Sequence, residues 1–261
     1  MKQFTMIGTA ALLFLFGNMG LAHARPAQGR GQQGQNNQQG QGRAEQAHDR
    51  NDQRKSDQQE QRLSQQEQQR RIQTDQRNTT SYQRNLDSQM RLSQQRTVQL
   101  QQQKRMSQFR FQQDYDSRLR QQQQSLRNAR DDYNNDPYYY TASSFRYNRA
   151  GAYYQTNQYG ADLLRQAVNY GFQEGFRAGQ ADREDGWRSN YQSSYAYRDA
   201  NYGYSGRYVQ QSEYNYYFRE GFRRGYQDGF NHQNQYGISA NGNYGISGTV
   251  LSVIINLQSL R

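Results

Sequence analysis

Hydrophobic residues are sparse in the first half of the chain and frequent in the second. Over residues 61–132 they recur at helical spacing in a Gln- and Arg-rich background, as Tyr82, Leu86 and Met90, then Phe111, Tyr115, Leu119 and Leu126. Gln, Arg and Leu favour helix, and residues four apart share one helical face. The pattern predicts a long polar helix over 61–132, with weak self-association as one option. The apolar stripe is too thin for a strong coiled coil, so a fluctuating helix or a disordered run is the open alternative.

The second half contains a fourteen-residue unit that occurs twice. The first copy, Asn169 to Asp182, reads NYGFQEGFRAGQAD, and the second, Asn215 to Asp228, reads NYYFREGFRRGYQD, so nine of the fourteen positions match. Repeats of this kind mark structural units. Each copy is expected to form most of one amphipathic helix.

The residues around the repeat place the ends of these two helices. Asp162 is a candidate N-cap for a helix that runs to about Arg183, and Ser212 is one for a helix that runs to about Phe230. Between them, the Tyr-, Ser- and Asn-rich residues 187–211 predict a long connection. The aromatic-rich residues 138–160 are expected to be irregular chain that covers the core.

Each predicted helix carries a row of small residues beside a row of large ones. The small rows are Ala167, Gly171, Gly175 and Gly179, then Gly221, Gly225 and Gly229; the large rows are Leu164, Val168, Phe172 and Phe176, then Phe218, Phe222, Tyr226 and Phe230. A glycine inside a helix costs ~1 kcal/mol relative to alanine, so contacts that alanine would prevent must offset it. We predict that the two helices pack as an antiparallel pair, with the rings of one in the glycine groove of the other.

This packing defines the expected fold class and domain organisation. The fold is predicted to be mainly α: a disordered basic N-terminal arm over 25–60, the polar helix over 61–132, and a small Tyr/Gly-rich helical module over 133–261. The module is built on the two glycine-ridged helices of the duplicated unit, 169–182 and 215–228. Charges interrupt both copies, which argues against insertion of these helices in a membrane.

Charged residues recur at matching places in the two copies. Glu174 and Arg177 are three residues apart, as are Glu220 and Arg223. Such pairs are expected to form surface salt bridges worth ~0.3–0.5 kcal/mol each. Pairing between the two helices is a second structural option.

The C-terminal segment, residues 249–260, reads TVLSVIINLQSL. Its apolar residues fit strand alternation and helical spacing equally well, so periodicity does not decide between them. Branched Val and Ile favour strand slightly. A strand here would need a partner that the sequence does not identify.

The N-terminus has the pattern of a secretory signal peptide over residues 1–24. Lys2 precedes a short apolar run from Met6 to Phe16, and Ala22-His23-Ala24 fits the small-x-small cleavage rule. The run is shorter than the ~20 residues that span a bilayer as a helix, so no transmembrane span is expected in the mature chain. We therefore expect export to the periplasm, the cell envelope or the extracellular space.

The basic charge of the mature chain lies entirely in its N-terminal half. Residues 25–130 hold 20 Lys and Arg against 10 Asp and Glu, whereas residues 131–261 hold 12 of each. Such asymmetry is typical of an interaction arm beside a neutral module. Residues 25–130 as a whole are expected either to contact anionic polymers, such as acidic polysaccharide, lipopolysaccharide or extracellular nucleic acid, or to act as a solvated spacer.

Residues for catalysis are few. The chain has no cysteine, which excludes thiol catalysis and zinc–thiolate sites, and its only histidines beyond the signal peptide are His48 and His232. Residues 182–186 resemble a calcium loop only in their acids and lack its bidentate Glu. The sequence predicts no catalytic, cofactor-binding or metal-binding residue, no cofactor, and a protein that is not an enzyme.

The repeat, the tract RMSQFRFQQDYDSRLRQQQ and the terminal ISGTVLSVIINLQSLR resemble a group of uncharacterised secreted proteins of soil bacteria. That group is rich in Tyr and Gly and repeats an E-G-F-R-x-G-x-x-D-like helix; the likeness covers most of residues 105–261. The resemblance implies export and no activity, ligand or catalytic residue. We expect an exported structural or assembly protein that self-associates through its module. The alternative is a polyanion-binding protein that acts through its basic arm.

Overall fold

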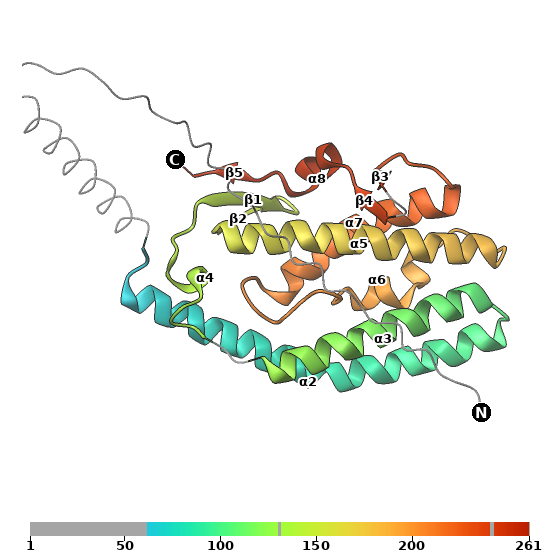
Figure 1. Cartoon of the computed structure of the whole chain (residues 1–261), viewed down its shortest axis with the longest axis horizontal. Coiled ribbons are helices and arrows are strands. Elements are labelled where there is room, and N and C mark those ends of the chain that lie inside the picture. Colours follow the sequence, from blue (N-terminus) through green and yellow to red (C-terminus); the bar gives the residue numbers. More distant parts are fainter. Residues whose placement is uncertain (1–61, 130–131, 241–242, 261) are drawn as a thin grey trace, which may run out of the picture. The chain divides into compact units, whose positions relative to one another are not determined.

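The computed structural model describes residues 62–129, 132–240 and 243–260, which belong to one compact unit and are mainly helical (Figure 1). The signal peptide and the 25–60 segment expected from the sequence lie outside the described residues. The elements are helices α2 (Gln65–Gln102), α3 (Met106–Asn128), α4 (Pro137–Tyr140), α5 (Gln158–Glu184), α6 (Tyr195–Asp199), α7 (Gln211–Asn231) and α8 (Gly248–Ile255), strands β1 (Phe145–Arg149), β2 (Ala152–Thr156), β3 (Gly237–Ala240), β4 (Asn243–Ile246) and β5 (Gln258–Ser259), and the short helix η1 (Tyr191–Ser193).

The polar segment is helical, but it forms two helices, so the expectation of one long helix over 61–132 was wrong. Ser64 and Glu67 form a capping box that starts α2, and the chain reverses at Lys104, which has a left-handed backbone. Helix α3 then returns beside α2 (Figure 1). The predicted apolar face is confirmed, because Tyr82, Leu86, Phe111, Tyr115 and Leu119 are buried.

The break between α2 and α3 has a tertiary cause, since the sequence Gln103-Lys104-Arg105 contains no typical turn residue. Arg105 is buried and forms an ion pair with Asp182 of α5. Its guanidinium also lies over the ring of Trp187, 4.5 Å from the centroid. A straight helix would carry Arg105 away from these partners, so the contacts favour the reversal.

Helices α5 and α7 lie side by side and run in the same direction, so the predicted antiparallel arrangement was wrong. Gly171, Gly175 and Gly179 face Phe218, Phe222 and Tyr226 in that order. Residue numbers therefore rise together along the contact, which only parallel helices allow.

The parallel arrangement follows from the length of the connection. A short loop between two packed helices makes them antiparallel. Residues 185–210 are instead long enough, with η1 and α6, to return the chain along α5 before α7 begins. The sequence analysis identified this long connection. Its length allows the two helices to run parallel, which a short loop would not.

The predicted close crossing of the glycine rows is confirmed, but main chain fills the glycine groove in place of rings. A Cβ atom at Gly175 would overlap the carbonyl of Phe222, and one at Gly225 would overlap the carbonyl of Phe172. The aromatic rings extend to the sides of the contact. On α7 they follow one another in a row: Tyr214, Phe218, Phe222, Tyr226 and Phe230.

Residues that were expected to be irregular chain form a small sheet. Strands β1 and β2 pair antiparallel, with Tyr147 opposite Tyr154. The C-terminal β5 adds to the other edge of β1, where Phe145 pairs with Ser259. Strand β1 is therefore the partner of the C-terminal strand, which the sequence did not identify.

The C-terminal segment is both helix and strand. Residues 248–255 form α8, with Ser247 as its N-cap, so the slight preference for strand was wrong there. Asn256 has a left-handed backbone that ends the helix before β5 begins. Before α8, strands β3 and β4 pair antiparallel, with Ile238 opposite Gly245.

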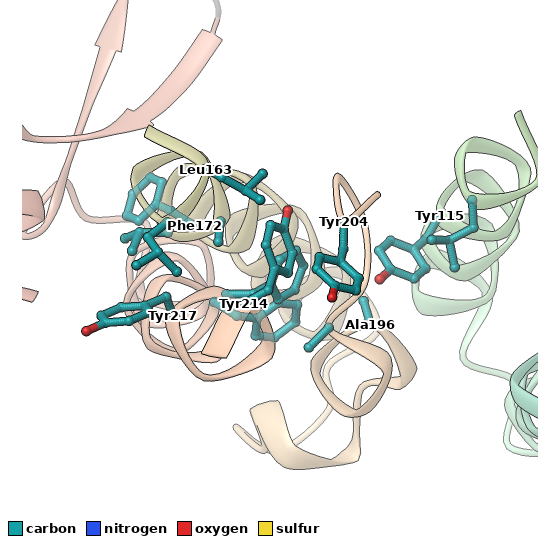
Figure 2. Close-up of a cluster of buried hydrophobic side chains, with 14 of the residues drawn as sticks. Tyr115, Leu163, Phe172, Ala196, Tyr204, Tyr214 and Tyr217 are labelled. Carbon is teal, nitrogen blue, oxygen red and sulfur yellow. The ribbon is translucent and has the colours of Figure 1, made fainter. Parts of the chain in front are cut away.

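The core is dominated by tyrosine. The connection between α5 and α7 places Tyr204 and Ala196 between Tyr214 of α7 and Tyr115 of α3 (Figure 2). The rings of Tyr204 and Tyr214 are 5.1 Å apart. Because the hydroxyl groups of Tyr204 and Tyr115 donate to Val209 O at 3.0 Å and to Asp199 Oδ2 at 2.6 Å, these rings are buried without an unpaired donor.

Candidate anion-binding surface

The α2–α3 hairpin carries the positive charge of the described part of the chain. Residues 62–129 hold 13 Lys and Arg against 5 Asp and Glu, whereas residues 132–260 hold 11 of each. The sequence predicted this imbalance, and the fold now places it on one folded hairpin. The surface of that hairpin is therefore the candidate site.

Four arginines of α2 form a straight row on the surface of the hairpin. Arg70, Arg77, Arg84 and Arg91 follow one another at intervals of seven residues, and all four are exposed. Seven residues of an α-helix rise about 10.5 Å and rotate by about 700°, which is about 20° less than two full turns. Successive arginines therefore lie almost directly above one another. The row, which we call the arginine row, is thus a regular array of positive charge along one face of α2.

The same seven-residue period explains why the row faces solvent. The residues of α2 that pack inward recur at alternating spacings of four and three: Asp75, Thr79, Tyr82, Leu86, Gln89, Ser93, Arg96 and Leu100. Because the inward residues and the arginines both repeat every seven residues, the two sets stay on opposite faces along the whole helix. Exposed neutral residues along the same stretch of α2 include Gln73, Ser81, Ser88 and Gln95. The sequence also places an acid, Asp87, three residues after Arg84 and four before Arg91.

The inward-facing acids of the hairpin have hydrogen-bond donors, either from the second half of the chain or from the hairpin itself. Asp75 is buried and accepts hydrogen bonds from Tyr139 Oη at 2.8 Å and from the backbone N of Tyr208 at 3.0 Å. Burial raises the pKa of Asp75, and the same cause raises the pKa of Asp116, which accepts from Ser93. These carboxyls therefore do little to neutralise the outer face.

The hairpin is fixed to the second half of the chain by buried charges. Arg118 of α3 donates to Glu174 of α5 at 2.6 Å, and Arg177 donates to the same carboxylate at 2.9 Å. Glu174 is buried, so the expectation that it forms only a surface pair was wrong. Glu220, at the matching position of the second copy, does form the predicted pair with Arg223, and it forms a further pair with Arg224.

Two of the three acids in residues 182–186, Asp182 and Asp185, also have structural partners. Asp182 accepts from Arg105 and from Tyr226 Oη, the latter at 2.6 Å. Asp185 accepts from the backbone N of Ser107 at 2.8 Å and of Gln108 at 2.9 Å, and thereby caps the start of α3. Asp182 and Asp185 therefore join α5 to α3 and α7.

Neither metal binding nor membrane crossing finds support in the part of the chain that the structure describes. No group of three or more His, Cys, Asp or Glu side chains could hold a metal ion there. Among the same residues, no helix has the length and apolarity needed to cross a membrane.

Comparisons with protein-family models, with curated proteins and with solved structures gave no match for this chain. The arginine row is the candidate feature that composition alone did not identify. Its sequence evidence was available, because Arg recurs every seven residues over a segment already predicted to be helical.

Proposed function

We propose that this chain is an exported, non-enzymatic protein that binds anionic polymers through the exposed face of α2. The observation that carries the proposal is the arginine row of Arg70, Arg77, Arg84 and Arg91. The second half of the chain acts as the scaffold that presents this face.

A regular row of separated charges suits a polymer better than a small ligand. Each arginine lies about 10.5 Å from the next along the helix, so one small anion contacts only one of them. An extended polyanion contacts all four arginines. Once one contact has formed, the other anionic groups of the polymer are held at high effective concentration near the remaining arginines, so weak contacts add up to tight binding. Duplex DNA carries one negative charge per about 1.7 Å of helix axis, so several phosphates lie along the length of the row.

The hairpin is held rigidly enough to present the row as one unit. Tyr139, Arg105 and Arg118 each make a buried or half-buried polar contact that ties the hairpin to the rest of the fold. A preorganised array loses little conformational entropy when a ligand binds. Most of the conformational entropy lost on binding is therefore that of the polymer.

Self-assembly is the second candidate. The glycine rows already pack α5 against α7 within one chain, so they offer no surface to another copy. What favours assembly is β2, which pairs with β1 on one side only and exposes 62% of Tyr153. An open strand edge can pair with another chain. Sedimentation of the full chain at rising concentration tests this candidate, and a monomer throughout would argue against it.

The salt dependence of binding tests the main proposal. Binding of the full chain to duplex DNA and to heparin is measured over a range of salt concentrations. For DNA, each phosphate contact contributes about 0.9 to the slope of log K against log salt. The double variant Arg77→Gln/Arg84→Gln should therefore reduce the slope by about 2 and weaken binding to both polymers.

The matched control removes charge elsewhere. The double variant Arg146→Gln/Arg188→Gln removes the same number of charges, from exposed positions in β1 and in the connection between α5 and α7. It should leave the slope close to that of the unchanged chain. Equal slopes for all the variants would show that net charge alone, and not the row, causes binding.

A further inference from the structure

A cavity lies between the second half of α2 and the segment that contains η1 and α6. Its volume is about 240 Å³, and its walls come from Gln89, Leu92, Gln95, Arg96 and Gln99 of α2 and from Ser193, Tyr195, Arg198 and Asp199. Pockets for drug-sized ligands start at about 300 Å³. This cavity therefore has room for one group of monosaccharide size.

Two arginines from different elements face this cavity, which we call the Arg96–Arg198 cavity. The guanidinium of Arg96 donates to Gln99 Oε1 at 3.2 Å, and Arg198 Nε donates to the backbone O of Gln192 at 3.1 Å. In the described part of the chain, neither arginine forms an ion pair with a carboxylate. Both guanidinium groups keep donors for a further acceptor, since each has five N–H bonds.

The surroundings of Arg96 favour an anion in the cavity. Partial burial, and then the positive charges of Arg105 and Arg198, lower the pKa of Arg96. Asp182 opposes this lowering, but it forms its ion pair with Arg105 and not with Arg96. A carboxylate between Arg96 and Arg198 would relieve their repulsion and could form charge-assisted hydrogen bonds to both.

Asp199 is the one acid in the cavity wall, and its oxygens are already occupied. It accepts from Tyr115 Oη at 2.6 Å and from the backbone N and Nδ2 of Asn201 at 3.1 and 2.9 Å. Asp199 is buried, and burial raises its pKa, which reduces its tendency to carry charge. It therefore opposes an incoming anion less than an exposed carboxylate would.

The remaining walls suit a hydroxyl-bearing ring. The amide side chains of Gln89, Gln95 and Gln99 supply donors and acceptors. Leu92, which is 57% exposed, and the ring of Tyr195 supply an apolar surface. A sugar acid presents hydroxyl groups, a C–H face and one carboxylate, which match these three kinds of wall.

We propose that the Arg96–Arg198 cavity binds one acidic sugar residue, with its carboxylate between the two guanidinium groups and its hydroxyl groups on the glutamine amides. The inference rests on the proposed function and deepens it, because it identifies the polymer as an acidic polysaccharide. Gln95 belongs both to the cavity wall and to the exposed outer face of α2, so a chain that follows the arginine row reaches the cavity next.

The first test uses single sugars and the full chain. Glucuronate is titrated at fixed ionic strength, and the side-chain signals of Arg and Gln are followed by NMR. Glucose, which lacks the carboxylate, and inorganic phosphate, which lacks the ring, serve as comparison ligands. Glucuronate should bind at least about tenfold more tightly than glucose, because the charge-assisted bonds are lost without the carboxylate. Phosphate that binds as tightly as glucuronate would overturn the assignment to a sugar.

Variants then locate the site. Arg96→Gln and Arg198→Gln should each weaken glucuronate binding about tenfold. Arg198 is exposed, so its variant keeps the test valid even if the half-buried Arg96 proves necessary for folding. Arg91→Gln, in the arginine row outside the cavity, should leave glucuronate binding unchanged. Equal binding by all three variants would overturn the proposal.

The two proposals fail in different ways. If glucuronate does not bind but the salt slope still falls in Arg77→Gln/Arg84→Gln, the cavity assignment is wrong and polyanion binding stands. If glucuronate binds through Arg96 and Arg198 but the salt slope does not change, the cavity assignment stands and the arginine row is not the polymer site.

Discussion

At the scale of single residues, equivalent positions of the duplicated unit have different roles. Asp182 accepts from Arg105 and Tyr226, whereas Asp228 accepts from the backbone N atoms of residues 235, 236 and 237, at 2.9–3.0 Å. The duplicated sequence predicted two similar helices correctly. It did not predict the partners of its acids, because those partners come from segments outside the repeat.

The glycine rows give the first prediction. Gly225→Ala should destabilise the protein by about 1–3 kcal/mol, because the new Cβ would overlap the carbonyl of Phe172 and main chain cannot move without separating the helices. This expected net loss already includes the ~1 kcal/mol by which alanine favours helix over glycine. Thermal and denaturant unfolding measure it. Gly248→Ala is the control, since no atom lies within 4 Å of a Cβ there; equal effects of the two changes would contradict the close crossing.

The two glutamates of the repeat give a matched pair of variants. Glu174→Ala leaves Arg118, whose side chain is 26% exposed, without its carboxylate partner and should cost about 3 kcal/mol. Glu220→Ala removes a carboxylate that is 30% exposed and should cost about 0.5 kcal/mol. Urea unfolding measures both changes. Similar losses at the two positions would mean that burial of Glu174 contributes nothing.

At the scale of elements, helix α3 is started by a residue of another segment. Its N-cap position, Arg105, makes no side-chain cap, and Asp185 accepts the free backbone N–H groups of Ser107 and Gln108 instead. A carboxylate at this end of a helix also interacts favourably with the helix dipole. The start of α3 therefore depends on α5, which explains why local sequence did not reveal it.

This dependence can be measured. Asp185→Ala should cost about 1 kcal/mol, as loss of an N-cap does, and should speed hydrogen exchange of the first-turn amides of α3 about fivefold. Asp162→Ala, which removes an exposed carboxylate on α5, should not change exchange in α3. Unchanged protection of Ser107 and Gln108 in Asp185→Ala would show that the cap does not stabilise α3.

At the scale of the whole molecule, buried carboxyls dominate the dependence of stability on pH. Burial is the main cause that raises the pKa of each of six carboxyls: Asp75, Asp116, Glu174, Asp182, Asp199 and Glu213. A carboxyl with a raised pKa binds its proton more tightly in the folded state. Its contribution to stability is complete below the unfolded pKa of about 4 and is lost as pH rises through the folded value.

The protein should therefore become more stable as the solution is made mildly acidic. The melting temperature should be higher at about pH 5 than at about pH 8, in the opposite direction to a protein whose carboxylates are stabilised by ion pairs. Calorimetry across this range tests the direction. A melting temperature that falls steadily from pH 8 to pH 5 would mean that the ion pairs of Glu174 and Asp182 outweigh their burial.

The sequence by itself determined the helical class, the two glycine-rowed helices, the apolar face of residues 61–132 and the basic half of the chain. Each follows from spacing or composition, which act locally. Only the tertiary structure decided that α2 and α3 are separate helices, that α5 and α7 run parallel, and that Glu174 is buried. Those outcomes depend on contacts between distant segments, such as Arg105 with Asp182 and Arg118 with Glu174. Local patterns carry no information about which distant partner a charge will meet.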